Sequence, residues 1–146
     1  MTRWILIAAL MVSSCRGGPA APVDIAMGQD ACAHCRMAIV SRSTAAQIVR
    51  PGDEPVFFDE VGCLRDYLLH TALPGDAVVY VADHRTGEWV DARNAIFTQT
   101  ATSTPMASGL LAHTDAASRD ADPSAAGGGA TAASLILGSP ERSTTP

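Results

Sequence analysis

Four residues with metal-binding or redox side chains lie within six consecutive positions of the sequence. The stretch CAHCRM contains Cys32, His34, Cys35 and Met37. Its C-x-x-C spacing fits three kinds of chemistry: a redox dithiol, half of a structural zinc site, or a clip for a soft metal ion. Thiolate and thioether sulfur together favour Cu(I) over hard cations, because both ligands are soft. His34 is a further candidate ligand, with a solvent-facing loop position as the alternative.

The rest of the chain gives little support for zinc or for thioredoxin-like chemistry. Structural zinc sites usually have a second ligand pair, whereas no second C-x-x-C and no H-x-x-x-H spacing occurs in the sequence. A thioredoxin-like pair should open a helix, whose dipole lowers the pKa of the thiol. Residues 35–41 (CRMAIVS) instead predict a strand. On a strand, Cys35 and Met37 would share a face, which favours a soft-metal site.

Two sulfur residues further along the chain are additional candidates. Cys63 falls in the first turn of a helix predicted to begin at Asp59, where the helix dipole favours a thiolate. The alternative for Cys63 is a small buried apolar residue. Met106 follows a proline in TPMASG, residues 104–109. A methionine in an exposed turn is a poor core residue but a usable soft ligand.

The beginning of the sequence is typical of an exported lipoprotein. The nine apolar residues WILIAALMV are too short to span a bilayer and fit a signal-peptide core. The following VSSC resembles a bacterial lipobox, so we expect residues 1–14 to be removed and Cys15 to be lipidated. A plain secretory signal with a chance cysteine is the alternative. Lipidation would anchor the protein to a bacterial membrane, facing the periplasm, where conditions are oxidising.

Cysteine number and charge narrow the function further. After Cys15, three cysteines remain, so at least one thiol is free, metal-bound or joined to a partner. The chain has 10 basic and 15 acidic residues, and the basic ones are scattered arginines. No nucleic-acid surface is therefore expected. Neither a phosphate-binding loop nor a serine nucleophile elbow is visible, and no enzymatic activity is predicted.

The expected architecture is α+β, with a small antiparallel sheet and one clear helix. Residues 15–28 are expected to carry the lipid and form a flexible tether, and residues 29–113 to form one domain. Residues 114–146 are of low complexity and expected to be partly disordered. The predicted elements are a strand at 35–41 with a hairpin partner at 45–50, strands at 56–58, 77–83 and 88–92 with 94–99 continuing the last, a helix from Asp59, and a last strand at 134–138.

Several motifs occur in an order that resembles the NosL family, copper lipoproteins accessory to nitrous oxide reductase. They are CAHCRMAI, FFDEVGCLRDYL, YVADHRTGEWVDARNAIF and TPMASGLLA, behind a lipobox. The resemblance covers residues 30–113. It implies two small ββαβ units with a likeness to organomercurial lyase. It also implies an extracytoplasmic Cu(I) chaperone whose acceptor is nitrous oxide reductase or its assembly machinery.

The resemblance also implies roles for particular residues. Cys35 and Met37 match the family's Cys-x-Met element, and Met106 matches the methionine of Thr-Pro-Met. Cys32 and Cys63 are further sulfur ligands by this interpretation. The chain departs from the family at residue 113, where histidine stands in place of phenylalanine, and in its poorer final stretch.

Three alternatives remain open from the sequence. The copper acceptor need not be nitrous oxide reductase, because generic delivery to another extracytoplasmic copper protein fits equally well. A thiol–disulfide or mercury-handling lipoprotein would use Cys32, Cys35 and Cys63 but would need neither Met37 nor Met106. In a non-metal interaction lipoprotein, the sulfur atoms would simply pack.

Overall fold

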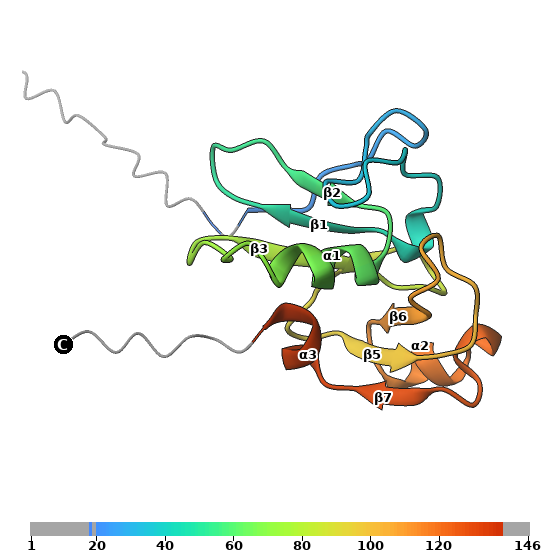
Figure 1. The fold of residues 1–146 in the computed structure, drawn as a ribbon. Helices are drawn as coiled ribbons and strands as arrows, with labels where there is room; N and C mark the ends of the chain where they lie inside the picture. The colour runs from blue at the N-terminus through green and yellow to red at the C-terminus, as the bar shows by residue number, and fades with distance from the viewer. Residues whose placement is uncertain (1–17, 19, 139–146) are drawn as a thin grey trace, which may run out of the picture.

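Residues 46–49 form an inner strand with a neighbour on each side in a four-stranded antiparallel sheet. All four side chains of this strand are buried. The computed structural model describes residues 18 and 20–138 (Figure 1). The sheet order is β2-β1-β3-β4. Its strands are β1 (Ala46–Val49), β2 (Val56–Phe58), β3 (Val78–Ala82) and β4 (Trp89–Asp91), with a 3-10 turn η1 (Arg42–Thr44) before β1.

A second antiparallel sheet of three strands follows, in the order β6-β5-β7. Its strands are β5 (Ile96–Gln99), β6 (Leu110–His113) and β7 (Gly129–Thr131). The helical elements are α1 (Val61–Leu68) after β2, then α2 (Ala116–Asp120), the 3-10 turn η2 (Pro123–Ala125) and α3 (Ala133–Leu137). The α+β prediction with small antiparallel sheets is confirmed.

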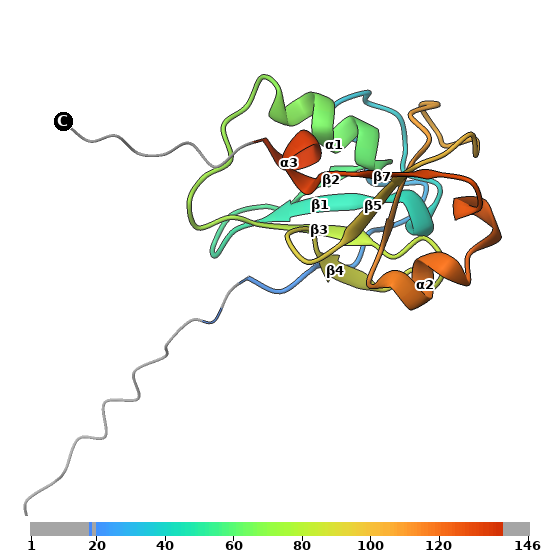
Figure 2. The same cartoon turned by 90° about the horizontal axis from the view of Figure 1, so that it is seen from below.

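The two sheets share one hydrophobic core. Phe58 and Leu64 from the first unit and Phe97 and Ile136 from the second belong to the same buried cluster. Helices α1 and α3 lie side by side (Figure 2). Burial of Leu64 on the inner face of α1 therefore fixes the position of the whole helix, including Cys63 in its first turn.

The predicted strand at 35–41 and its hairpin with β1 are wrong. Here the chain turns sharply, because Arg36 adopts a left-handed conformation with φ +67°. The loop is closed by Cys32 N–H donating to Met37 O at 2.8 Å and Arg36 N–H donating to Cys32 O at 2.9 Å. Only an isolated bridge joins Ala31 to Ala38. β1 pairs instead with β2 and β3, so sharing a strand face cannot bring Cys35 and Met37 together.

The structured part of the chain is longer than the predicted 29–113. Residues after 113 complete the second sheet through β7 and add α2, η2 and α3, so the expected disorder does not apply to residues 116–137. Glycine allows this close packing, because a Cβ at Gly128 would lie 2.6 Å from Thr98 Cγ2. The predicted last strand at 134–138 is helical and ends where Gly138 takes φ +76°.

The segment expected to be a tether also packs onto the first sheet. The Gln47 side chain is buried and pairs with both backbone groups of Val23, at 2.8 and 2.9 Å. Tyr80 Oη donates to Ala20 O at 3.0 Å, and Ile25 is buried in the core. The chain is thus attached to the folded domain from Ala20 onward.

Two smaller boundaries also differ from the sequence expectation. Residues 94–99 do not continue β4, because Asn94 N–H donates to Asp91 O and turns the chain into the second sheet. The helix cap is Glu60 rather than Asp59. Within the described residues, no helix has both the length and the apolar character that a membrane crossing requires.

Candidate metal centre

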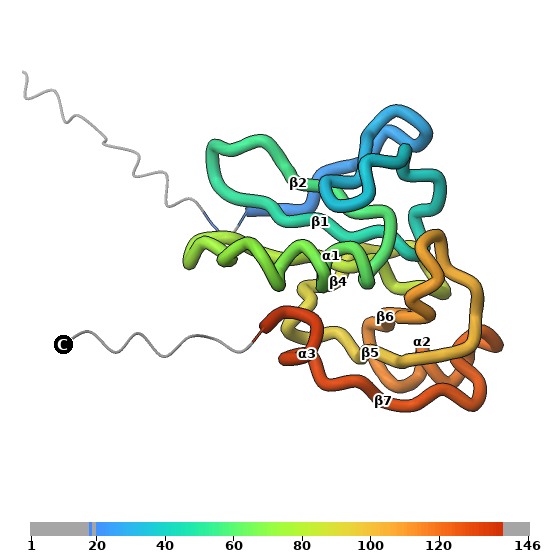
Figure 3. The backbone as a smooth tube through the Cα atoms, in the orientation of Figure 1, coloured from blue at the N-terminus to red at the C-terminus, as the bar shows by residue number. Residues whose placement is uncertain are grey.

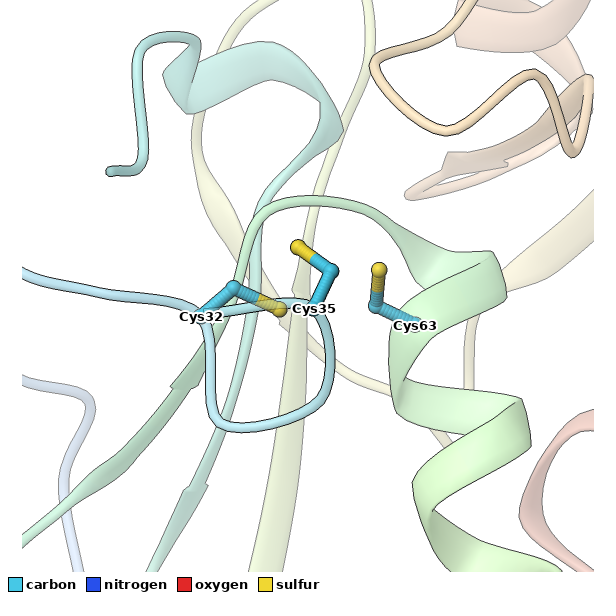
Figure 4. Close-up of side chains that lie close together, drawn as sticks. All are labelled: Cys32, Cys35 and Cys63. Atoms are coloured by element: carbon cyan, nitrogen blue, oxygen red, sulfur yellow. The ribbon is translucent and has the colours of Figure 1, made fainter. Parts of the chain in front are cut away.

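Three unpaired cysteines converge at the first turn of α1. Cys32 and Cys35 come from the loop before η1, and Cys63 comes from the helix (Figure 4). Their sulfur atoms all lie within 4.8 Å of one another. The structure thus brings together the C-x-x-C motif and a cysteine that lies about thirty positions further on. Such a cluster of thiols is a ligand set for a soft metal ion.

The loop that carries Cys32 and Cys35 directs backbone N–H groups at their sulfur atoms. The N–H groups of His34, Cys35 and Asp59 donate to Cys32 sulfur, and that of Met37 donates to Cys35 sulfur. Ala33 N–H donates to Phe57 O at 2.8 Å, which fastens the loop to β2. Hydrogen bonds of this kind stabilise a thiolate and orient it before any ion arrives.

Cys32 has the most easily ionised thiol of the three, because its pKa is lowered and the other two are raised. The Cys63 thiol hydrogen-bonds to Cys32 sulfur and, with the backbone donors, lowers the pKa of Cys32 to about 4. That same hydrogen bond, together with burial, raises the pKa of Cys63, and burial raises the pKa of Cys35. A metal ion that binds all three sulfurs must therefore displace protons from Cys35 and Cys63.

The three cysteines differ in their access to solvent. Cys32 is 0% exposed and Cys63 is 2% exposed, whereas Cys35 is partly exposed. Cys35 is therefore the thiol of the group that solvent reaches most easily.

The loop that carries Met106 packs against the same end of α1. Met106 N–H donates to the buried Glu60 carboxylate at 3.2 Å. Ser108 lies so close to Gly62 that a Cβ there would be 2.4 Å from Ser108 Cβ. In Figure 3 this loop, between β5 and β6, extends from the second sheet towards the start of α1. Met106 is thereby held at the helix turn that carries Cys63, with its side chain 46% exposed.

The other predicted site residues do not belong to this group of three thiols. Met37 follows Cys35 in the loop, and its side chain is 46% exposed. His34 is exposed, and its ring nitrogens lie outside the convergent group. Cys15, the predicted lipidation site, lies outside the described residues. Left-handed residues adjoin both methionines, Arg36 before Met37 and Ala107 (φ +59°) after Met106.

Sequence analysis missed Glu60 and Gly62, which fix the Met106 loop. A glycine inside a predicted helix indicates close packing against another segment, because glycine otherwise lowers helix stability. A charged residue at the start of a helix is ordinary, so Glu60 gave no comparable signal.

We expect Gly62→Ala to lower the free energy of unfolding by up to about 2 kcal/mol. Alanine would raise helix stability by about 1 kcal/mol at an open site, but the clash with Ser108 is an overpacking of about 1–3 kcal/mol. Urea unfolding measures the change. Gly75→Ala is the matched control, because no atom lies within 4 Å of its Cβ position; an equal effect of both substitutions would contradict the packing argument.

Most of the chain matches one known family model. The NosL family model matches residues 22–136. Searches of curated proteins and of solved structures give no match. The matched range includes all three clustered cysteines, Met37 and Met106, and it extends beyond the predicted boundary at residue 113.

Proposed function

Because the chain belongs to the NosL family, we propose that it is a membrane-anchored Cu(I) chaperone facing the periplasm. It would deliver copper for the maturation of nitrous oxide reductase or a related copper protein. The observation that carries the proposal is the convergence of three free thiols within 4.8 Å. Copper is the cargo in this function.

The number and type of donors favour Cu(I) over structural Zn(II). Structural zinc sites are almost always four-coordinate. Among the described residues, the group contains three cysteine sulfurs and no histidine or carboxylate. Thiolate and thioether ligands select Cu(I), and the candidate thioethers are Met37, two residues after Cys35, and Met106, whose backbone bonds to Glu60 at the start of α1.

The difference in exposure supports a route for release. An acceptor ligand would reach the ion beside Cys35, the accessible thiol, while Cys32 and Cys63 still hold it. Met37 and Met106 are exposed on neighbouring loops and would stabilise an ion that is leaving the thiolates. A lipid on Cys15 would keep the loaded protein near membrane-bound acceptors.

The thiol–disulfide alternative is less compatible with this arrangement. Thiol exchange requires an accessible thiolate. Cys32 has the lowered pKa but is fully buried, whereas Cys35 is accessible but has a raised pKa. The thiol that ionises most easily is thus not the one that solvent reaches. This disfavours thiol–disulfide exchange but does not hinder the binding of a metal ion.

Competition for Cu(I) against a chromophoric chelator tests the proposal. Full-length protein in detergent is titrated under anaerobic, reducing conditions, with Zn(II) in parallel. We expect near-stoichiometric Cu(I) binding that Cys35→Ser weakens about 100-fold or more, because loss of an outer partner alone costs about 10–100-fold. His70→Ala, which removes an exposed imidazole beyond the far end of α1, should leave the affinity unchanged.

Three results would contradict the chaperone proposal. They are failure to retain Cu(I), preference for Zn(II), and unchanged affinity in Cys35→Ser. Delivery itself is tested by mixing the copper-loaded protein with copper-free nitrous oxide reductase and following the metal. Retention of copper by the loaded protein in that experiment would direct the search to another acceptor.

A further inference from the structure

A second group of possible metal ligands consists of two histidines and one aspartate and includes no cysteine. His84 follows β3, His113 is the last residue of β6, and Asp122 caps η2. Asp122 Oδ2 lies 2.6 Å from His84 Nδ1 and 2.9 Å from His113 Nε2. One donor atom from each residue falls within 4.8 Å of the others.

These three side chains are held in place before any ligand binds. Asp122 Oδ1 accepts from Ser124 N–H at 2.8 Å, which points Oδ2 at the imidazoles. His84 N–H donates to Ala112 O at 2.8 Å, so the end of β3 is tied to β6. Burial raises the pKa of Asp122, but the hydrogen bonds from both histidines and from Ser124 outweigh it and lower the pKa to about 2. The carboxylate is therefore charged at neutral pH.

Burial shields two of the ligands and leaves one accessible. His113 is 0% exposed and Asp122 is 5% exposed, whereas the His84 side chain is 17% exposed. His84 is thus the entry side for a small ion.

The donor set is that of a metal site. Both imidazoles converge on the same buried carboxylate oxygen. Two nitrogen donors and one carboxylate around a shared point are a common set for a borderline divalent cation.

We propose that His84, His113 and Asp122 form a second metal site, for a divalent cation of the Zn(II) or Cu(II) class. Zinc–ligand distances of about 2.0–2.1 Å require donor atoms about 3.3 Å apart in a tetrahedron. The two observed separations of 2.6 and 2.9 Å would therefore lengthen by about 0.4–0.7 Å. The imidazole protons now directed at Asp122 would move to the other ring nitrogens, His84 Nε2 and His113 Nδ1.

A bound cation would join the two sheets. His84 lies in the turn after β3 of the first sheet and His113 belongs to the second, so the ion would link that turn to the second sheet. Because the ion binds only the folded state, the thermal midpoint should rise with its concentration.

The test uses Zn(II) and, separately, Cu(II), on full-length protein in detergent carrying Cys32→Ser, Cys35→Ser and Cys63→Ser. Removing these three thiols abolishes the proposed Cu(I) site, so failure here is distinguishable from failure of the Cu(I) proposal. We expect one equivalent of ion to bind, and His113→Phe and Asp122→Asn each to weaken binding at least tenfold. His70→Ala is the matched control and should bind normally.

Imidazole nitrogen resonances of the unmutated protein provide a readout that needs no variant to fold. With the cysteines loaded with Cu(I) first, added Zn(II) should shift the signals of His84 and His113 and leave those of His34 and His70 in place. The proposal is overturned if no ion binds, if His113→Phe and Asp122→Asn bind normally, or if only the exposed histidines respond. Tighter binding of one ion identifies the preferred cation.

Discussion

Replacing Cys63 by serine is expected to weaken Cu(I) binding about 100-fold or more. The Cys63 sulfur lies within 4.8 Å of both other thiols, and its helix is fixed by core packing. Loss of an outer partner of a ligand costs about 10–100-fold in affinity, so loss of a ligand should cost at least as much. Serine keeps the size of the side chain, and the fold should therefore survive. Chelator competition measures the affinity, and circular dichroism checks the fold.

Chelator competition on methionine variants compares the contribution of the thioether ligands to Cu(I) affinity with that of the thiolates. Met37→Leu and Met106→Leu preserve volume, and both side chains are exposed. We expect each to weaken binding less than Cys63→Ser and to slow transfer to an acceptor. If Cys63→Ser bound copper normally while Met106→Leu did not, the ion would be held by Cys35 and the methionines, without the helix cysteine.

Asp83→Asn is expected to lower the free energy of unfolding by about 3 kcal/mol. The fully buried Asp83 carboxylate accepts four hydrogen bonds, from Arg85 N–H, Thr86 N–H and Ser118 Oγ at Oδ1 and from Thr114 N–H at Oδ2. The amide nitrogen of asparagine would face a donor at one oxygen position, and each buried unsatisfied group costs about 1–3 kcal/mol. Urea unfolding at neutral pH measures the loss.

The pH dependence of stability gives an independent check on Asp83. Burial raises the pKa of Asp83, but hydrogen bonds from Thr114, Ser118 and Thr86 outweigh it and hold the pKa well below its ordinary value. A lowered pKa in the folded state means that its contribution is present above pH of about 4 and is lost as the pH falls further. Asp83→Asn should flatten this acid slope relative to the unmutated protein. Equal slopes in the two proteins would contradict the assignment.

Local patterns predicted the first sheet well, because its strands are short apolar runs and its helix has regular apolar spacing. The runs at 56–58 and 77–83 became β2 and β3, and the helix expected from Asp59 begins two residues later at Val61. The motif residues Cys32, Cys35 and Cys63 were also visible in the sequence, and the structure brings them together. What the pattern could not reveal was a turn at Arg36, where arginine occupies a conformation that usually favours glycine.

The second sheet was harder to predict for a different physical reason. Its last strand, Gly129–Thr131, has little apolar side chain to signal burial. It is held by backbone pairing to β5 and by a close approach at Gly128 that only a missing Cβ permits. Composition alone makes such a segment look disordered. The group of His84, Asp122 and His113 was not predicted for another reason: its members are far apart in the sequence.

The attachment of the chain at Ala20 limits how far the domain can stand from the membrane. Only five residue steps separate Cys15 from Ala20, whose carbonyl accepts from Tyr80. At about 3.3–3.6 Å per residue, these steps reach about 17 Å at full extension, compared with about 45 Å for a leash that ended at Gly28. With a lipid on Cys15, as we propose, Ala20 would stay within about 17 Å of the lipidated residue. An acceptor would then meet a domain that rests against the membrane and cannot swing far from it.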